Sequence, residues 1–437
     1  MKDLPPAQAG RRAPRAAGVV TAGAVAAGLL TAGSGPLPAD ANDTPGIHLS
    51  RTYGAPGDEV RVSGGVPGSD KGTTALQALR RGRWVTLVRG RHHGSYALRA
   101  PLRDGVQTWR VLVDGQSTPT VRLRGVTPGP YDPPPGPVFT AVAPAASGTD
   151  LPTLSTDGRW VAVRGARVPL LRDRLTGRAE KPWAQDARPA LSPDGRLVTL
   201  VRRGRGVLLD LWTFATTPLP RPAGRRVAAA APADDGSLAL VLVDGDGLRA
   251  PFVLRPGDES PEQLAPATDG TVQAVLASGS DTVALTTSAA LTADDVDEAE
   301  DAYLLLDGSP ELLDETADAR THSPTLSADG RRVAWLAESP GGTEVVVRDV
   351  GTGAELFRHP ADEAVLSGDG THVAWRDGDV LASSDLDAPT TRSVAVPDAR
   401  ELAVSGDGRW VAFTATASPI DGGATPSATW LWDRDAD

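Results

Sequence analysis

The chain contains no cysteine among its 437 residues, and lysine and histidine are scarce. The missing thiols exclude disulfides, thiolate metal ligands, cysteine nucleophiles and a lipid-modified N-terminal cysteine. The six histidines show no metal-ligand spacing such as H-x-x-x-H, and no G-x-S-x-G nucleophile elbow occurs. Only 3 lysines stand against 41 arginines, which together with the many alanines is typical of a GC-rich bacterial genome. The sequence therefore predicts neither a metal or other cofactor site nor a catalytic triad.

The net charge of −11 is divided unevenly along the chain. Residues 47–125 hold 13 basic and 5 acidic side chains, whereas residues 126–437 hold 27 basic and 47 acidic ones. Because contacts to phosphates need Lys and Arg, we expect no nucleic-acid partner for the acidic part. The basic segment could meet an anionic polymer or dock on its acidic neighbour, and its charge alone leaves both open.

The N-terminus has the pattern of a secretory signal peptide, residues 1–41. Three arginines in the first fifteen residues precede an uncharged apolar stretch, residues 16–33, and a small-x-small pattern follows at Ala39–Ala41. This order predicts cleavage between Ala41 and Asn42. An uncleaved anchor is the competing interpretation, and Sec and Tat export are both open. We expect a bacterial protein that is secreted or associated with the cell envelope, with no membrane span after signal removal.

Residues 47–125 alternate apolar and polar side chains in short runs separated by Gly- and Asp-rich turns, which predicts half-buried strands of a β-sandwich. The expected strands are Glu59–Val62, Trp84–Val88, Tyr96–Leu98, Trp109–Val113 and Thr120–Leu123. The run Leu79–Val85 resembles the Ig-like modules of bacterial surface and secreted proteins. His92 and His93 are adjacent, so on a strand they would point to opposite faces and form a poor metal site. A proline-rich linker, residues 126–137, is expected to follow.

From Leu154 onward one short motif recurs about every 40 residues. The clear copies are Leu154–Ala162, Leu191–Val198, Pro232–Ala239, Leu326–Ala334, Leu366–Ala374 and Val404–Ala412, and Leu276–Ala284 is a degenerate copy in the one long gap. Its S-x-D-G core suits a tight turn with glycine in the left-handed conformation, and the apolar runs on both sides make a hairpin. A third apolar segment follows in each unit, and a short fourth segment follows in all but the last. Four strands per period of about 40 residues are typical of a propeller blade.

The hairpin, the third strand and the D-x-x-T-G turn at Asp349–Gly353 resemble the TolB-type, WD-like propeller repeat, which also occurs in the prolyl oligopeptidase family. The expected fold is all-β, with a propeller over residues 138–437 after the small sandwich. The count of copies predicts seven blades, and six is the alternative if the degenerate copy is an insertion. The last copy lacks a fourth segment, so we expect residues 138–142 to complete it and close the ring.

Polar residues four or five positions before the motif serine should face one rim of the ring and could hold a ligand. These candidates are Asp150, Arg188, Gln273, His322, Asp362, Glu363, Arg400 and Glu401. A weaker hypothesis is a calcium site in the acidic run after Leu291, at Asp294, Asp295, Asp297 and Glu298. The run lacks the fixed oxygen spacing of a known loop, so a solvated charge run is the simpler interpretation. The tryptophans that recur near the motif are expected to pack between blades rather than to stack on sugars.

The resemblance to prolyl oligopeptidases suggests a hydrolase, but those enzymes carry an α/β-hydrolase domain after the propeller and none is expected here. We therefore predict a secreted, non-catalytic binding or scaffold protein, a monomer that recognises a protein, a peptide or a cell-envelope polymer. The alternative is an enzyme centred on the propeller channel, of the lyase or glycosidase type. The fold by itself cannot decide between them, because propellers host both functions.

Overall fold

The structure is a computed structural model that describes residues 45–437 except 67–70, 129–130, 134–135, 144–151, 164–169, 181–186, 279, 297–298, 314–319, 389 and 437. The predicted signal peptide and its predicted cleavage site at Ala41 and Asn42 lie outside this part of the chain. Residues 44–437 form one compact unit. The described residues fold into strands and turns with no helix, and so none of their elements is a helix that could cross a membrane.

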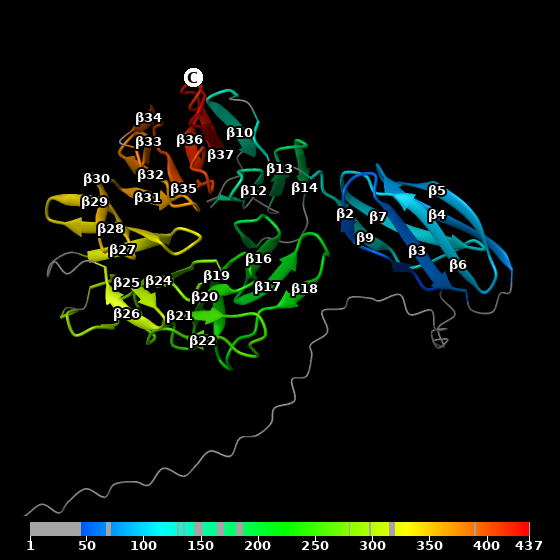
Figure 1. Ribbon diagram of the computed structural model, residues 1–437, viewed down its shortest axis with the longest axis horizontal. Coiled ribbons are helices and arrows are strands. Elements are labelled where there is room, and N and C mark those ends of the chain that lie inside the picture. The colour runs from blue at the N-terminus through cyan, green and yellow to red at the C-terminus, as the bar shows by residue number, and fades with distance from the viewer. Residues whose placement is uncertain are drawn as a thin grey trace, which may run out of the picture. The chain divides into compact units, whose positions relative to one another are not determined.

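Two sheets are built from residues 48–125 (Figure 1). One contains β1 (His48–Leu49), β3 (Glu59–Gly65) and β6 (Ser95–Pro101); the other has the order β2 (Tyr53–Gly54), β9 (Val121–Gly125), β7 (Gly105–Val113), β4 (Gly72–Arg80) and β5 (Arg83–His92), with β8 (Gln116–Ser117) on β7. Each strand expected from the alternation overlaps one of these strands. Val60, Leu76, Leu98 and Trp109 form their shared core. The strands thus bury one face each, as period-two alternation requires.

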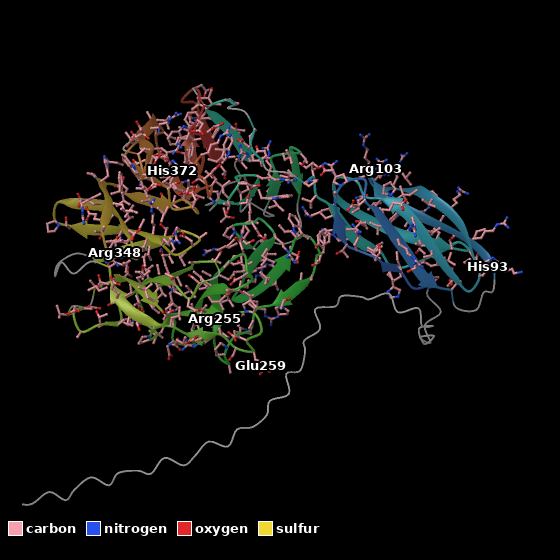
Figure 2. The ribbon with its side chains drawn as sticks, viewed as in Figure 1. His93, Arg103, Arg255, Glu259, Arg348 and His372 are labelled. Carbon is pink, nitrogen blue, oxygen red and sulfur yellow. The ribbon has the colours of Figure 1, made fainter. Side chains whose placement is uncertain are left out.

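His92 and His93 lie on opposite sides, as expected for neighbours at the end of a strand. His92 is buried, and its Nε2 lies 2.8 Å from Oδ2 of Asp114. His93 is exposed, and Figure 2 shows its side chain pointing away from the strands. The pair is therefore not a shared metal site.

The remaining strands form seven four-stranded antiparallel sheets, called sheets 1 to 7 below. Sheets 1 to 3 are β11 (Thr153–Leu154), β12 (Trp160–Val163), β13 (Leu170–Asp173), β14 (Arg178–Glu180); β15 (Arg188–Leu191), β16 (Leu197–Arg202), β17 (Arg205–Asp210), β18 (Thr216–Pro218); and β19 (Arg226–Pro232), β20 (Leu238–Val243), β21 (Arg249–Leu254), β22 (Glu262–Gln263). Sheets 4 to 6 are β23 (Gln273–Leu276), β24 (Val283–Thr287), β25 (Asp301–Leu306), β26 (Ser309–Leu312); β27 (Arg320–Leu326), β28 (Arg332–Ser339), β29 (Gly342–Asp349), β30 (Glu355–Pro360); and β31 (Glu363–Leu366), β32 (His372–Asp377), β33 (Val380–Asp385), β34 (Thr391–Ala395). Sheet 7 is β35 (Arg400–Val404), β36 (Trp410–Ala417), β37 (Ala424–Asp433) and β10 (Phe139–Ala143).

The sheets form a closed ring, so this part of the chain is a β-propeller. Each sheet contacts the next, and the first strands of sheets 1 and 7, β11 and β35, contact each other. Figure 1 shows the first strands nearest the centre of the ring and the fourth strands at its periphery. The expected closure is confirmed: β10 pairs with β37, with Phe139 opposite Trp432, and the Phe139 ring packs edge-on against Phe413. The degenerate copy builds a complete sheet, sheet 4, like the others.

The S-x-D-G motif forms the turn between the first and second strands. In sheet 1 the Ser155 hydroxyl donates to Asp157 Oδ1 (2.6 Å) and accepts from the Trp160 amide (2.9 Å). The Asp157 carboxylate accepts from the Arg159 amide (3.0 Å), and Gly158 has φ +66°. The same serine–aspartate bond recurs in sheets 2, 5, 6 and 7. The serine, aspartate and glycine therefore have a complete structural role within the turn.

The seven turns are also bonded to one another in a circle, here called the turn ring. A backbone amide of each turn donates to the turn of the next sheet, and sheet 7 donates back to sheet 1. The bonds are Thr156 N to Pro193 O, Asp194 N to Asp234 Oδ1, Asp234 N to Ser278 Oγ, Ser278 N to Ala328 O, Ala328 N to Gly368 O, Asp369 N to Gly406 O and Gly406 N to Thr156 O. The turns of sheets 7 and 1 approach so closely that position 406 must be glycine, because a Cβ there would lie 2.0 Å from Thr156 Cγ2.

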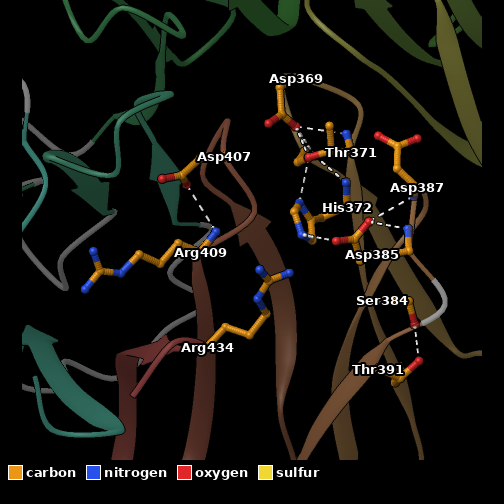
Figure 3. Close-up of polar contacts among 12 residues, drawn as sticks. Asp369, Thr371, His372, Ser384, Asp385, Asp387, Thr391, Asp407, Arg409 and Arg434 are labelled. Atoms are coloured by element: carbon orange, nitrogen blue, oxygen red, sulfur yellow. Dashed lines mark hydrogen bonds and ion pairs between the residues drawn. The ribbon is translucent and has the colours of Figure 1, made fainter. Parts of the chain in front are cut away.

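Sheets also pack through the second residue after each turn glycine. Trp410 of sheet 7 lies against Gly158 of sheet 1, and Trp160 of sheet 1 lies against Gly195 of sheet 2. His372 holds the same position between sheets 6 and 7, against Gly408; its Nδ1 lies 2.7 Å from Thr371 Oγ1, as Figure 3 shows. The expectation that the recurring tryptophans pack between blades is confirmed: Trp160, Trp335, Trp375 and Trp410 are all buried.

Candidate functional site

The first strands begin at the end of the propeller opposite the turn ring, and this end is called the strand-start rim. The expected candidates lie there: Arg188, Gln273, Glu363 and Arg400 are the first residues of β15, β23, β31 and β35. Glu401 is the second residue of β35 and His322 the third of β27, while Asp362 immediately precedes β31. The remaining candidate, Asp150, lies outside the described residues. Counting four or five positions back from the motif serine therefore correctly predicted residues that lie at one end of the ring.

Three first strands depart from regular pairing near this rim, and in sheet 3 the register shifts between Val227 and Ala229. The other two carry a left-handed residue. The register shifts between His322 and Thr325 in sheet 5 and between Arg400 and Ala403 in sheet 7. Ser323 (φ +54°) and Glu401 (φ +56°) hold the left-handed conformation at these bulges, each four residues before its motif serine. Left-handed non-glycine residues cost about 1–3 kcal/mol each and gather at functional sites. Bulges of this kind also turn side chains toward new directions.

A carboxylate of sheet 6 holds the bulge of sheet 7. Glu363 accepts hydrogen bonds from the amides of Glu401 (3.0 Å) and Leu402 (2.7 Å). Burial raises the pKa of Glu363 above its usual value, although both amide bonds act in the opposite direction. The Glu401 carboxylate accepts from the Thr414 hydroxyl (3.0 Å). Glu363 therefore links sheet 6 to sheet 7, and Glu401 stabilises the bulge within sheet 7.

In sheet 5 a serine, a histidine and a glutamate form a hydrogen-bonded row. His322 Nδ1 lies 3.0 Å from Ser323 Oγ, and its Nε2 lies 3.1 Å from Glu338 Oε1. Arg320 forms an ion pair with Glu300 of sheet 4 and lies 3.7 Å from Glu338. The row has the residue types of a hydrolytic triad, but the serine neighbours its histidine in the chain and contacts it through Nδ1.

The remaining candidates divide into a paired carboxylate and three exposed polar groups. Asp362 forms an ion pair with Arg376 (2.8 Å) and accepts from the Gly378 amide. Arg188, Gln273 and Arg400 are exposed to solvent at the rim. Among the expected candidates, two cations and an amide are therefore exposed to a ligand. Four carboxylates near the rim, Glu338, Asp362, Glu363 and Glu401, already have partners.

The acidic run is only partly described. Asp294 is exposed, the Asp295 carboxylate accepts a hydrogen bond from the Tyr303 hydroxyl, and Asp297 and Glu298 lie outside the described residues. Within the described part of the chain, no three His, Asp or Glu side chains are grouped to hold a metal ion. The calcium hypothesis thus stays a prediction that concerns residues beyond this description.

Two features were not found from the sequence. A cavity of about 220 Å³ lies beneath the linker, where the Arg174 guanidinium is 3.6 Å from the Trp410 ring and 5.1 Å from that of Tyr131. The other is a group of arginines on one face of the sandwich, beside the ring of Trp84. Neither could be read from spacing, because the partners come from strands or linkers far apart in sequence.

Neither a family profile nor a curated protein matches the chain. Among solved structures, TolB from Acinetobacter baumannii is similar at 14% identity and a TM-score of 0.40, with 77% of this chain and 78% of that chain covered. The Dos1 propeller has 9% identity and a TM-score of 0.41, with 68% and 95% covered. The Pyrococcus horikoshii acylaminoacyl peptidase has 14% identity and a TM-score of 0.43; the match covers 65% of this chain and 48% of the peptidase chain. The fold assignment rests instead on the ring of sheets described above.

Proposed function

We propose that the chain is a secreted, non-catalytic bacterial binding protein, a monomer in which an Ig-like module precedes a seven-bladed propeller. The observation that carries the binding role is the asymmetry between the two ends of the propeller. At one end the turn ring links the seven turns by hydrogen bonds, five between backbone groups and two from a backbone amide to a side-chain oxygen. With about 5 Å between neighbours, such a circle is about 11 Å across between Cα atoms, too narrow for a folded partner. The strand-start rim is the end that offers exposed groups.

A protein or peptide partner suits this rim best. The first strand of each sheet pairs with another strand on one edge only, so its other edge carries backbone donors and acceptors, of which the amides of Glu401 and Leu402 are taken by Glu363. Arg188, Gln273 and Arg400 are exposed at the start of these strands. A peptide carries both kinds of backbone group and charged side chains of either sign. A cell-envelope glycan is the alternative ligand at the same rim.

The absence of cysteine allows a clean crosslinking test. The full chain carrying Gln273→Cys would be labelled with benzophenone maleimide and irradiated in the extracellular fraction of the producing culture. Arg331→Cys, exposed at the turn end, is the matched control. We expect one protein or peptide to be crosslinked from position 273 only, and to be lost when Arg188 and Arg400 are both changed to Gln. Equal labelling from both positions, or none from position 273, would contradict the proposal.

The row of Ser323, His322 and Glu338 is the one observation that favours an enzymatic alternative. If it were a hydrolytic site, Ser323 would react covalently with a fluorophosphonate probe. We expect no labelling of the full chain and no difference between it and Ser323→Ala. Labelling that disappears in Ser323→Ala would replace the binding proposal with a hydrolase.

A further inference from the structure

The larger sheet of the sandwich presents an arginine-bearing face that the propeller function does not use. Residues directly opposite each other in antiparallel strands project to the same side. Arg91 lies opposite Thr73, Arg89 opposite Ala75, and Arg110 opposite Gln77. Ala75 and Gln77 alternate with buried Leu76 and Ala78 on β4, so the three arginines stand on the outer side. This set of Arg89, Arg91 and Arg110 is called the basic face.

The arginine in the middle of the sheet is held in place. The Arg110 guanidinium lies 4.1 Å from the centre of the Trp84 ring, and its Nε donates to Gln77 Oε1 (3.0 Å). No carboxylate of the described residues forms an ion pair with any arginine of the basic face. The outer nitrogens of Arg110 are thus fixed in direction and available to an anion.

Protection of the sheet edge does not account for this arrangement. Arg89 and Arg91 lie on the edge strand β5, where charges discourage pairing with other sheets. Arg110 lies on β7, between β9 and β4, where no free edge exists. Two other outward arginines, Arg122 and Arg124, stack on aromatic rings of the propeller, at 4.3 Å from Phe214 and 5.6 Å from Trp160. Within the basic face, Arg89 and Arg91 are exposed and Arg110 is half-buried.

A hollow lies beside Arg89 on this face. It has a volume of about 320 Å³ and is lined by Thr73, Gln77, Thr86, Arg89, Leu112 and Asp114, among others. Asp114 is its one acid, and the carboxylate accepts from the Thr73 amide (2.7 Å) and contacts His92 (2.8 Å). The hydroxyl and amide groups suit the hydroxyls of a sugar, and the arginines suit its anionic groups.

We propose that the basic face binds an acidic polysaccharide, a glycan chain that carries carboxylate or phosphate groups. The Arg89 and Arg110 positions are two strands and two residues apart, about 12 Å, so one chain with repeated charges can reach both. Arg110 covers one face of the Trp84 ring, so that face is not open to stacking by a nucleobase. Three arginines are also fewer than the phosphate contacts of a typical duplex binder. Charge and polarity together favour a glycan.

The test measures binding of the full chain to polygalacturonate, dextran phosphate and neutral dextran at low salt. We expect binding to one or both acidic polymers and none to dextran. Arg89→Gln and Arg110→Gln should each weaken binding about tenfold, the worth of one charged hydrogen bond. Gln77→Ala should weaken it several-fold without changing net charge, because it frees Arg110. Arg99→Gln, an exposed arginine on β6 of the other sheet, is the control and should stay within twofold.

Four results would overturn the proposal: no binding to either acidic polymer, an equal loss in Arg99→Gln, equally tight binding of single-stranded DNA, or self-association that Arg89→Gln and Arg110→Gln abolish. The last would identify a second copy, with its acidic propeller, as the occupant. Crosslinking from position 273 at the strand-start rim is independent of all four. The two proposals can therefore fail separately.

Discussion

Two ion pairs at the same repeat position, one buried and one exposed, allow a matched test of what holds the propeller together. Arg159 in sheet 1 binds both oxygens of Asp173, at 2.9 and 3.0 Å, and the two side chains are 5% and 7% exposed. Arg196 in sheet 2 binds one oxygen of Asp210, and its side chain is 44% exposed. We predict that Asp173→Asn is far more destabilising than Asp210→Asn.

The magnitudes follow from burial. Asp173→Asn keeps the side-chain shape but leaves the buried Arg159 charge without its carboxylate, which costs about 3–5 kcal/mol. Asp210→Asn loses a solvent-screened pair, worth about 0.2–1 kcal/mol. Burial alone would raise the pKa of Asp210, but hydrogen bonds from Arg196 and the amides of Thr213 and Trp212 outweigh it and lower that pKa. The stability that ionised Asp210 contributes is therefore present at neutral pH. It is lost as the pH falls through the pKa of Asp210 in the folded protein.

The assay is urea unfolding followed by tryptophan fluorescence at pH 7, with the free energy of unfolding compared between the two variants. A double variant, Arg159→Met with Asp173→Leu, replaces both charges with apolar groups and should be more stable than Asp173→Asn. Equal losses in Asp173→Asn and Asp210→Asn, or a double variant no better than Asp173→Asn, would refute the reasoning from burial.

Three further predictions concern the ring. Gly406→Ala should cost about 1–3 kcal/mol by forcing the turn ring apart, whereas Gly245→Ala, where a Cβ meets nothing within 4 Å, should be near neutral in the same urea titration. Phe139→Ala on the closing strand should lower the free energy of unfolding by about 2–3 kcal/mol, and no change would mean that β10 does not close the ring. Burial and nearby Arg434 lower the pKa of His372, so stability should fall as the pH drops below the unfolded value of about 6.5. His372→Leu should flatten that fall, as measured by thermal unfolding between pH 7 and 5.

The local chemistry of the repeat could be read from the sequence because each turn is completed within six residues. Ser155, Asp157 and Gly158 satisfy one another and their own backbone, so their recurrence predicted the hairpins and the end at which the rim candidates lie. The pairing of β10 with β37 was also predictable, because one unit lacked a strand and the segment at 138–142 had no unit of its own.

Tertiary structure alone decided which side chains meet. Glu363 binds the amides of Glu401 and Leu402 only because sheets 6 and 7 are neighbours and β35 carries a bulge. Gln77 meets Arg110 only because of the register in which β4 pairs with β7. A shift of one residue in that register would turn the Gln77 side chain to the other face of the sheet. The alternation of apolar and polar residues and the identity of the turn residues depend only on positions a few residues apart in the chain. Contacts across strands and sheets depend on packing between residues 30 to 40 positions apart.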